Sequence, residues 1–196
     1  MKLANLASEI WKNSTVMEIT PTEIWDEDFF LKQWFDNNEH IDKYTKTSPG
    51  WYWIGCEIDF QDLKDISPTL EKELPKSACR ISDLARRNFQ TFSTKNLCKK
   101  NKNNSLIIYN GHQSNIINRV RQHFMLNNNR TGAIGLKYYP LSGRKWTIIF
   151  FGKRNIKQLR DEDQPEVERL ITEKSGRVAI ESAWRAYYGW PILCKE

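Results

Sequence analysis

The amino-acid sequence predicts an α+β fold, in which a small antiparallel β-sheet is flanked by helices and carries a helical insertion. Three observations support this prediction. Short apolar and β-branched runs typical of strands occur in the middle of the chain. Segments whose apolar residues recur at helical spacing stand between and after them. The length of 196 residues suits one domain with its own core, so residues 1–196 are expected to form a single domain.

The N-terminal residues 1–48 are expected to form a helical extension of this domain. The clearest element is an acidic, aromatic helix that begins at Pro21 and ends near Asn37. Proline is well tolerated in the first helical turn, and Thr20 or Thr22 is a suitable N-cap.

The first strand of the expected sheet covers residues 51–58, because this run is aromatic and β-branched and follows a Pro-Gly turn. Residues 59–104 are polar and contain two helix candidates and a loop rich in lysine and asparagine. We interpret them as an insertion into the main domain, since their helices could not bury a core alone.

The second strand is expected at residues 105–111, an apolar run that ends in a turn at Gly111. A helix then runs to Met125, with Ser114 or Asn115 as its cap. Its apolar stripe consists of Ile116, Ile117, Val120 and Phe124. On this helix Arg119 and His123 lie four residues apart, and therefore on one face.

The rest of the chain predicts two strands and two helices. The strands are expected at residues 133–139 and 145–151, and a Pro-Leu-Ser-Gly turn joins them. The helices are expected at residues 164–174 and 177–188, with Ser175-Gly176 as the break between them.

Composition narrows the class of protein. Hydrophobic residues make up 39% of the chain and charged residues 28%, and no apolar run is long enough to cross a bilayer, so no membrane partner is expected. The N-terminus lacks the apolar stretch of a signal peptide. The 4 cysteines are scattered without metal-site spacing, which is typical of free thiols in a reducing compartment. A cytoplasmic location is therefore expected.

Charge is distributed unevenly along the chain. Residues 84–160 contain 16 Lys and Arg residues and no Asp or Glu. Residues 1–60 contain 5 basic and 11 acidic side chains, so the net charge of +6 has its origin in the central stretch. Such a stretch favours binding of a polyanion, and nucleic acid is the expected partner. A solvated basic face without a partner is the alternative.

A series of short motifs carries a resemblance to a known family. In chain order these are Gly50-Trp51-Tyr52, Tyr109-Asn110-Gly111, Arg119 with His123, Glu181, and Pro191-Ile192-Leu193-Cys194. Their order, and the eight-residue step from Gly111 to Arg119, resemble the GIY-YIG superfamily of nucleases. The long gap between the tyrosine motifs is most similar to the restriction endonucleases of that superfamily. Trp51 and Asn110 depart from the usual aliphatic residues, and Cys194 stands where asparagine is common.

The resemblance implies an endodeoxyribonuclease that hydrolyses phosphodiester bonds of double-stranded DNA with one divalent metal, Mg²⁺ or Mn²⁺. A type II restriction enzyme of this kind is expected to act as a homodimer, because a double-strand cut needs two active sites. Glu181 would bind the metal, and Arg119 would hold the scissile phosphate. Tyr52 is the candidate base, with His123 as its helper or as the base itself, and Tyr109 would orient the water or the phosphate.

Basic residues outside this set are candidates for DNA binding. They are Arg86, Arg87, Lys99, Lys100, Lys102, His112, Arg121 and Arg130. Arginine mixed with asparagine is typical of residues that read base edges, but the same side chains also suit phosphate contacts.

Ordinary structural interpretations and other functions stay open. Tyr52 and Tyr109 also fit strand aromatics with solvated hydroxyls, and Arg119 also fits an exposed helix cation. Glu181 lies beside apolar residues, where an unpartnered carboxylate is costly, and this favours a ligand role. The alternative functions are a non-specific or structure-selective repair or phage nuclease, and a catalytically inactive nucleic-acid-binding module.

Overall fold

The computed structural model describes residues 3–19, 49–69, 74–75, 78–99, 101–102, 104–126, 132–141 and 143–195. Within these ranges the protein is an α+β protein built on an antiparallel sheet, as the sequence predicts. The helix expected between Pro21 and Asn37 lies outside the described residues, as do Lys100 and Arg130.

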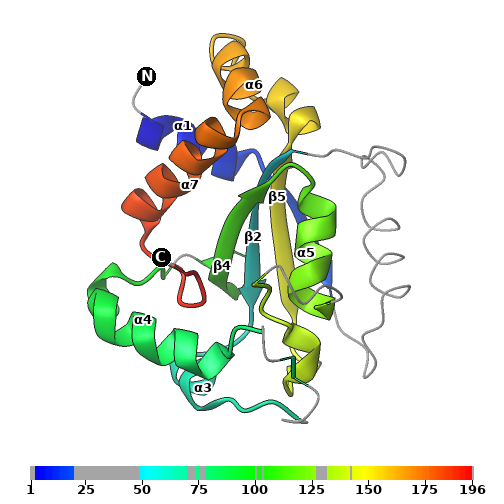
Figure 1. The fold of residues 1–196 in the computed structure, drawn as a ribbon. Coiled ribbons are helices and arrows are strands. Elements are labelled where there is room, and N and C mark those ends of the chain that lie inside the picture. Colours follow the sequence, from blue (N-terminus) through cyan, green and yellow to red (C-terminus); the bar gives the residue numbers. More distant parts are fainter. Residues whose placement is uncertain are drawn as a thin grey trace.

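The sheet contains β1 (Thr15–Ile19), β2 (Gly50–Cys56), β3 (Asn101–Lys102), β4 (Ser105–Gln113) and β5 (Trp146–Gly152). The strand order is β1-β5-β2-β4-β3, and every pair is antiparallel. Four strands have five residues or more, and the two-residue β3 adds a short edge. All seven residues of β2 are buried, because β4 and β5 flank it and helices cover both of its faces (Figure 1).

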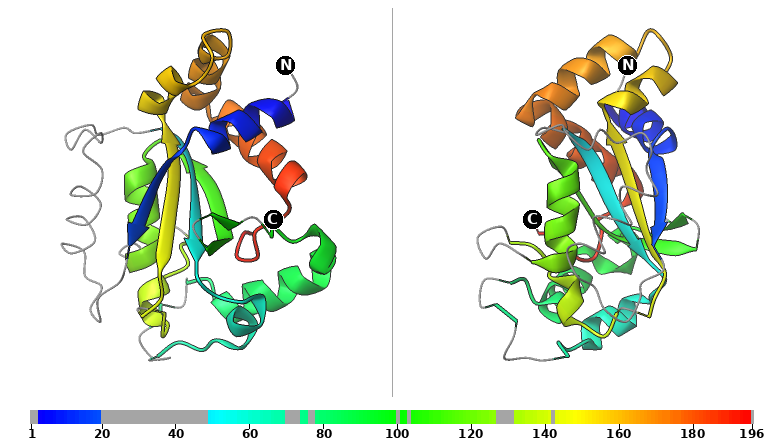
Figure 2. Two further views of the ribbon diagram at one scale, coloured as in Figure 1. Left: turned by 180° about the vertical axis from the view of Figure 1, so that it is seen from behind. Right: turned by 90° about the vertical axis from the view of Figure 1, so that its right-hand side faces the viewer.

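Helices on the two faces of the sheet form two separate cores. Alternation along β2 directs Trp51 and Trp53 to one face, where they pack with α1 (Leu3–Lys12), α6 (Gln164–Thr172) and α7 (Lys174–Tyr188). Tyr52 and Ile54 point to the other face, which α5 (Ile116–Met125) covers. Figure 2 shows α1 and α7 on one side of the sheet and α5 on the other.

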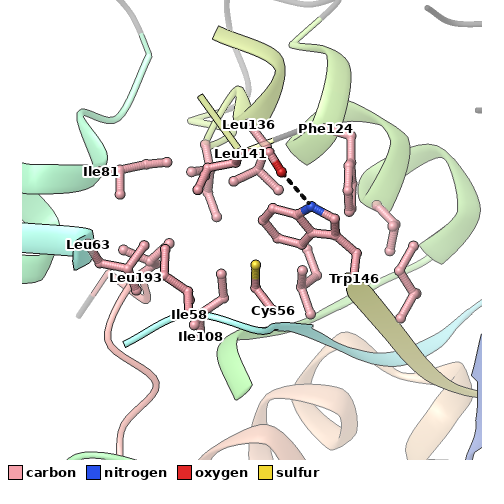
Figure 3. Packing of buried hydrophobic residues seen from close by; sticks show 14 of the residues in the cluster. Cys56, Ile58, Leu63, Ile81, Ile108, Phe124, Leu136, Leu141, Trp146 and Leu193 are labelled. Atoms are coloured by element: carbon pink, nitrogen blue, oxygen red, sulfur yellow. Dashed lines mark hydrogen bonds between the residues drawn. The ribbon is translucent and has the colours of Figure 1, made fainter. Parts of the chain in front are cut away.

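The insertion shares the core of the α5 face. Its helices are α3 (Phe60–Asp65) and α4 (Ile81–Asn96), and Leu63, Ile81 and Leu84 belong to the same buried cluster as Trp146. Figure 3 shows Trp146 at the centre of this cluster. Its indole nitrogen donates to the Leu141 carbonyl at 3.2 Å, so the one polar atom of the ring is satisfied.

Several predicted elements are confirmed. The strand at 51–58 is β2, the strand at 145–151 is β5, and the helix ending at Met125 is α5. Asn115 caps α5, since its side chain accepts a hydrogen bond from the Asn118 amide at 3.0 Å. The two C-terminal helices are α6 and α7, although α7 already begins at Lys174 and the break falls at Glu173.

Other predictions were wrong. Residues 133–139 do not form a strand: they contain a short 3-10 helix, Leu136–Tyr138, which Gly135 starts in the left-handed region at a φ of 69°. The fourth long strand of the sheet is β1 instead, so residues 15–19 belong to the sheet and not to a helical extension. Gly111 does not form a turn either, because β4 continues to Gln113.

Candidate active site

Two tyrosines and a histidine gather on the α5 face of the sheet. The Tyr52 hydroxyl lies 3.0 Å from Nε2 of His123, within hydrogen-bond distance. The ring centroids of Tyr109 and His123 are 4.3 Å apart, and those of Tyr52 and Tyr109 are 6.1 Å apart in a stacked arrangement. Residues from β2, β4 and α5 thus form one compact cluster, as the sequence motifs predict.

Gly111 makes room for this cluster. It is the partner of Tyr52 in the β2–β4 register, and the tyrosine side chain lies across it. A Cβ atom at position 111 would stand 2.5 Å from the Tyr52 hydroxyl oxygen and 2.8 Å from Cζ. The glycine of the second motif is therefore needed for close approach, and not for a turn.

Burial fixes the protonation of the cluster. Tyr52 is 1% exposed and His123 is 0% exposed. Burial raises the pKa of Tyr52 well above its usual value, and the nearby Tyr109 adds to this, while the charge of Arg119 opposes it. Burial, with a further contribution from Arg119, lowers the pKa of His123 well below its usual value. Both rings are therefore neutral at physiological pH.

Arg119 and Tyr109 are the more accessible members of the group. Both are half-buried, unlike Tyr52 and His123. Nη1 of Arg119 donates to the Gln122 side chain at 3.3 Å on the same helix. A substrate would therefore meet Arg119 and Tyr109 before the buried pair behind them.

Glu181 lies on the α7 side of β4. Its Oε1 accepts a hydrogen bond from Arg185, and its Oε2 lies 3.6 Å from Nε2 of His112. Burial raises the pKa of Glu181, and Arg185 opposes this shift. Burial lowers the pKa of His112 to about 4, helped by the charges of Arg177, Lys174 and Arg185. The imidazole is therefore neutral at pH 7, and its contact with Glu181 is not an ion pair.

Arg185 connects this carboxylate to the rest of the fold. Its Nε donates to the Asn110 side chain at 2.8 Å, and its guanidinium lies 4.4 Å from the ring centre of Trp190. The Cys194 sulfur lies 3.2 Å from the Asn110 amide and 3.3 Å from its carbonyl oxygen. Cys194 thus holds the backbone of β4 at Asn110.

The cluster of Tyr52, Tyr109 and His123 and the pair of Glu181 and Arg185 lie on opposite sides of β4, near the end of the strand. Successive strand residues face opposite sides, so Gly111 faces the tyrosine cluster while Asn110 and His112 face α7. The negative charge of Glu181 contributes to the raised pKa values of Tyr52 and Tyr109. The predicted catalytic residues are therefore close enough to interact electrostatically around residues 109–112.

The predicted DNA-binding residues are more scattered. On α4, Arg86 and Arg87 are exposed, and Arg86 lies 3.9 Å from Asp65. Lys99 is exposed after α4, and Lys102 belongs to β3. Arg121 is half-buried on α5, where its Nη2 donates to Asn118 at 2.8 Å. His112 is neutral and packed beside Glu181, so it is poorly suited to a charged phosphate contact.

Carboxylates from outside the basic stretch neutralise part of its charge. Arg144 lies 3.2 Å from Asp62, and Lys145 lies 2.8 Å from Glu18. Arg160 forms ion pairs with Glu162 and Asp163, both at the start of the acidic C-terminal part. The count of cations in the sequence therefore overstates the positive charge that is free to attract DNA.

Sequence reasoning missed Arg185, Asn110 and Asn88 as parts of the site. Asn88 is 0% exposed, and its side-chain nitrogen donates to the carbonyls of Ile192 and Cys194 at 2.8 and 2.7 Å. The four-residue spacing of Glu181 and Arg185 was a visible signal for their ion pair. Nothing local in the sequence indicates the two asparagines, whose partners lie far along the chain.

The described residues contain no group of three or more His, Cys, Asp or Glu side chains that could hold a metal ion, and no helix long and apolar enough to cross a membrane. All four cysteines are buried free thiols. No protein-family model, curated protein or solved structure matches this chain.

Proposed function

We propose that the protein is a metal-dependent DNA endonuclease that hydrolyses phosphodiester bonds of duplex DNA, and that it is a type II restriction enzyme acting as a homodimer. The supporting observation is the convergence of Tyr52, Tyr109, Arg119 and His123 on one side of β4 with Glu181 on the other. These residue types come from four different elements, so their proximity is a property of the fold and not of sequence neighbourhood.

Proton transfer is assigned to the buried pair. With its proton on Nδ1, neutral His123 accepts the phenolic proton of Tyr52 at Nε2 across 3.0 Å. The resulting phenolate can then take a proton from an attacking water, which Tyr109 orients at the more accessible side of the cluster, so that the water becomes the nucleophile and the proton of Tyr52 stays on His123. Because the raised pKa keeps Tyr52 protonated at neutral pH, the histidine is needed as the acceptor that frees the phenolate.

Arg119 is assigned to the phosphate. Its positive charge lowers the pKa of both Tyr52 and His123, and this supports a role beside the reacting group. A guanidinium can neutralise charge that builds on the phosphorane while it holds a non-bridging oxygen. Its half-buried position leaves it open to a substrate.

Glu181 is the residue that would hold the metal. Magnesium accepts one or two carboxylates and otherwise keeps its water ligands, so a single glutamate is a sufficient protein ligand. Oε2 of Glu181 lies 3.6 Å from Nε2 of His112, beyond hydrogen-bond distance, whereas Oε1 is bonded to Arg185. When bound, such an ion would polarise the phosphoryl oxygen and stabilise the leaving oxygen.

A second function is favoured by a specific observation. Tyr52 and His123 are almost completely buried, and Arg185 already holds Glu181. A nucleic-acid-binding module that no longer cuts would show the same features. The two proposals differ in one measurable property, namely cleavage in the presence of a divalent metal.

The deciding experiment is digestion of a long DNA duplex with Mg²⁺ or Mn²⁺, followed by sequencing of the ends. Uniform ends would support restriction cleavage, and ragged ends would support a non-specific or structure-selective nuclease. Failure to cut at any tested metal concentration, with DNA binding intact, would support the inactive binding module.

Glu181→Gln is the matched variant for this experiment. It removes the carboxylate charge with little change of shape, so we expect the cleavage rate to fall at least ~10³-fold while DNA affinity changes little. Single-turnover rates and equilibrium affinities should be measured separately. A variant that cuts at a near-normal rate would contradict the assignment of Glu181 to the metal.

A further inference from the structure

Arg185 holds the carboxylate that the proposed reaction needs. Its guanidinium bonds to Oε1 of Glu181, and the two side chains are 15% and 14% exposed. A carboxylate so largely shielded from water is costly without a partner, so it depends on a nearby cation. In this structure Arg185 supplies that positive charge.

The position of Arg185 is fixed by contacts other than Glu181. Its Nε is bonded to the Asn110 side chain at 2.8 Å, and its guanidinium plane lies over Trp190 at 4.4 Å. Asn110 on β4 and Trp190 after the end of α7 therefore hold the guanidinium beside the carboxylate. An exposed ion pair at four-residue spacing contributes little to stability. The contact between Arg185 and Glu181 differs from such a pair because other residues also hold the guanidinium in place.

Among the described residues, no other charged side chain forms a hydrogen bond with Glu181. Nε2 of His112 approaches the second carboxylate oxygen only to 3.6 Å. Arg177 is held elsewhere, since its Nη1 donates to the carbonyls of Ile171 and Thr172 at 2.7 and 2.8 Å. Arg185 is thus the cation in direct contact with Glu181 among the described residues.

We propose that Arg185 and the divalent cation compete for Glu181, so that metal binding requires the guanidinium to release Oε1. Like charges repel strongly where water is largely excluded, and a single carboxylate cannot compensate three positive charges. Arg185 then raises the concentration of divalent metal that is needed to occupy the site. This inference rests on the proposed function only in taking Glu181 as the metal ligand.

The test is Mn²⁺ binding to the 196-residue chain without DNA, measured by the loss of the free Mn²⁺ signal in electron paramagnetic resonance. Arg185→Gln should bind Mn²⁺ at least ~10-fold more tightly than the wild type, because the competing charge is gone. Arg185→Lys keeps the charge and should stay within ~3-fold of the wild type. Arg169→Gln is the matched control, since Arg169 forms an exposed ion pair with Glu166 and should not alter Mn²⁺ affinity.

Two results would overturn the proposal, and they are distinguishable. If Arg185→Gln binds Mn²⁺ no more tightly than the wild type while Glu181→Gln loses binding, the competition is refuted and the metal assignment stands. If Glu181→Gln binds Mn²⁺ like the wild type, both the competition and the metal assignment fail.

A measurement on the wild type keeps the proposal testable if Arg185→Gln does not fold. The guanidinium nitrogen resonances of Arg185 should shift when Mg²⁺ is added, because Oε1 of Glu181 is released. Those of Arg177, which is bonded to carbonyls, should stay in place. Arg185 resonances that do not move at saturating Mg²⁺ would overturn the proposal.

Discussion

Gly111→Ala is the substitution that tests the placement of Tyr52 most directly. The added Cβ would stand 2.5 Å from the tyrosine hydroxyl oxygen and 2.8 Å from Cζ, both closer than real Cβ contacts allow. The ring cannot move aside freely, because it is 1% exposed and packed against Tyr109 and His123. Overpacking of this kind costs about 1–3 kcal/mol. Alanine regains roughly 0.5–1 kcal/mol over glycine in a strand, so the expected net loss lies between about 0 and 2.5 kcal/mol.

The assay is equilibrium unfolding in urea, with Gly143→Ala as the control. Position 143 has no heavy atom within 4 Å of an added Cβ, so that substitution should leave the free energy of unfolding nearly unchanged. Tyr52→Phe provides the second arm, since it removes the oxygen at 2.5 Å and keeps the carbon at 2.8 Å. Gly111→Ala should therefore cost at least ~0.5 kcal/mol less in the Tyr52→Phe background than in the wild type.

The outcome that refutes this reasoning is specific. If Gly111→Ala costs the same in both backgrounds, the tyrosine hydroxyl does not lie over Gly111. In the expected case the displaced hydroxyl also loses its 3.0 Å contact with His123, so DNA cleavage should fall with stability.

Two further predictions concern charge. Arg119→Ala should lower the single-turnover cleavage rate much more than DNA affinity, because the proposed contact strengthens in the transition state; an equal loss of both would make Arg119 an ordinary phosphate contact. His112 and His123 have lowered pKa values in the folded protein, so below pH ~6.5 the unfolded chain binds more protons than the folded one. The free energy of unfolding should therefore fall with decreasing pH by about 1.4 kcal/mol per pH unit for each histidine. His123→Gln should flatten the dependence of the unfolding free energy on pH by one proton, and an unchanged slope would show that this histidine is not buried in the neutral state.

The elements that the sequence predicts correctly carry strong local signals. The strand β2 is an aromatic and β-branched run after a Pro-Gly turn, and α5 has both a cap and an apolar stripe. In contrast, β1 is only five residues long, and its partner β5 lies more than 100 residues further along the chain. Its short alternation of buried and exposed residues is too brief to identify a strand without that partner.

The error at residues 133–139 has a different physical cause. The run contains buried apolar residues, as a strand would, but Gly135 adopts a left-handed conformation that turns the chain into a 3-10 helix. An apolar run shows that a segment is buried, and not which backbone conformation it has. The same limit explains Gly111, where a glycine provides space for Tyr52 inside a strand instead of a turn.

The candidate site was predictable in residue type but not in arrangement. The motif order selects Tyr52, Tyr109 and Glu181, and helical spacing places Arg119 and His123 on one face. The sequence does not show that Tyr52 and His123 are buried as a neutral pair, because burial depends on the surrounding helices. It also does not show that Arg185 and Asn110 connect α7 to β4, because that contact joins residues 75 apart in sequence.

Contacts along the edge of the sheet indicate where one substrate could reach both Arg119 and Glu181, which lie on opposite sides of β4. The short strand β3 pairs only with Ser105 and Leu106, and the C-terminal segment then follows β4 from Ile108 to Asn110. Beyond Asn110 the strand continues to Gln113, which is exposed. Because Gly111 carries no side chain, the two faces of β4 are separated there by backbone alone. We therefore expect a phosphate that reaches both Arg119 and Glu181 to approach along residues 111–113. Bulky substitution of the exposed Gln113 should then weaken DNA binding more than the same change at the exposed Gln90 on α4.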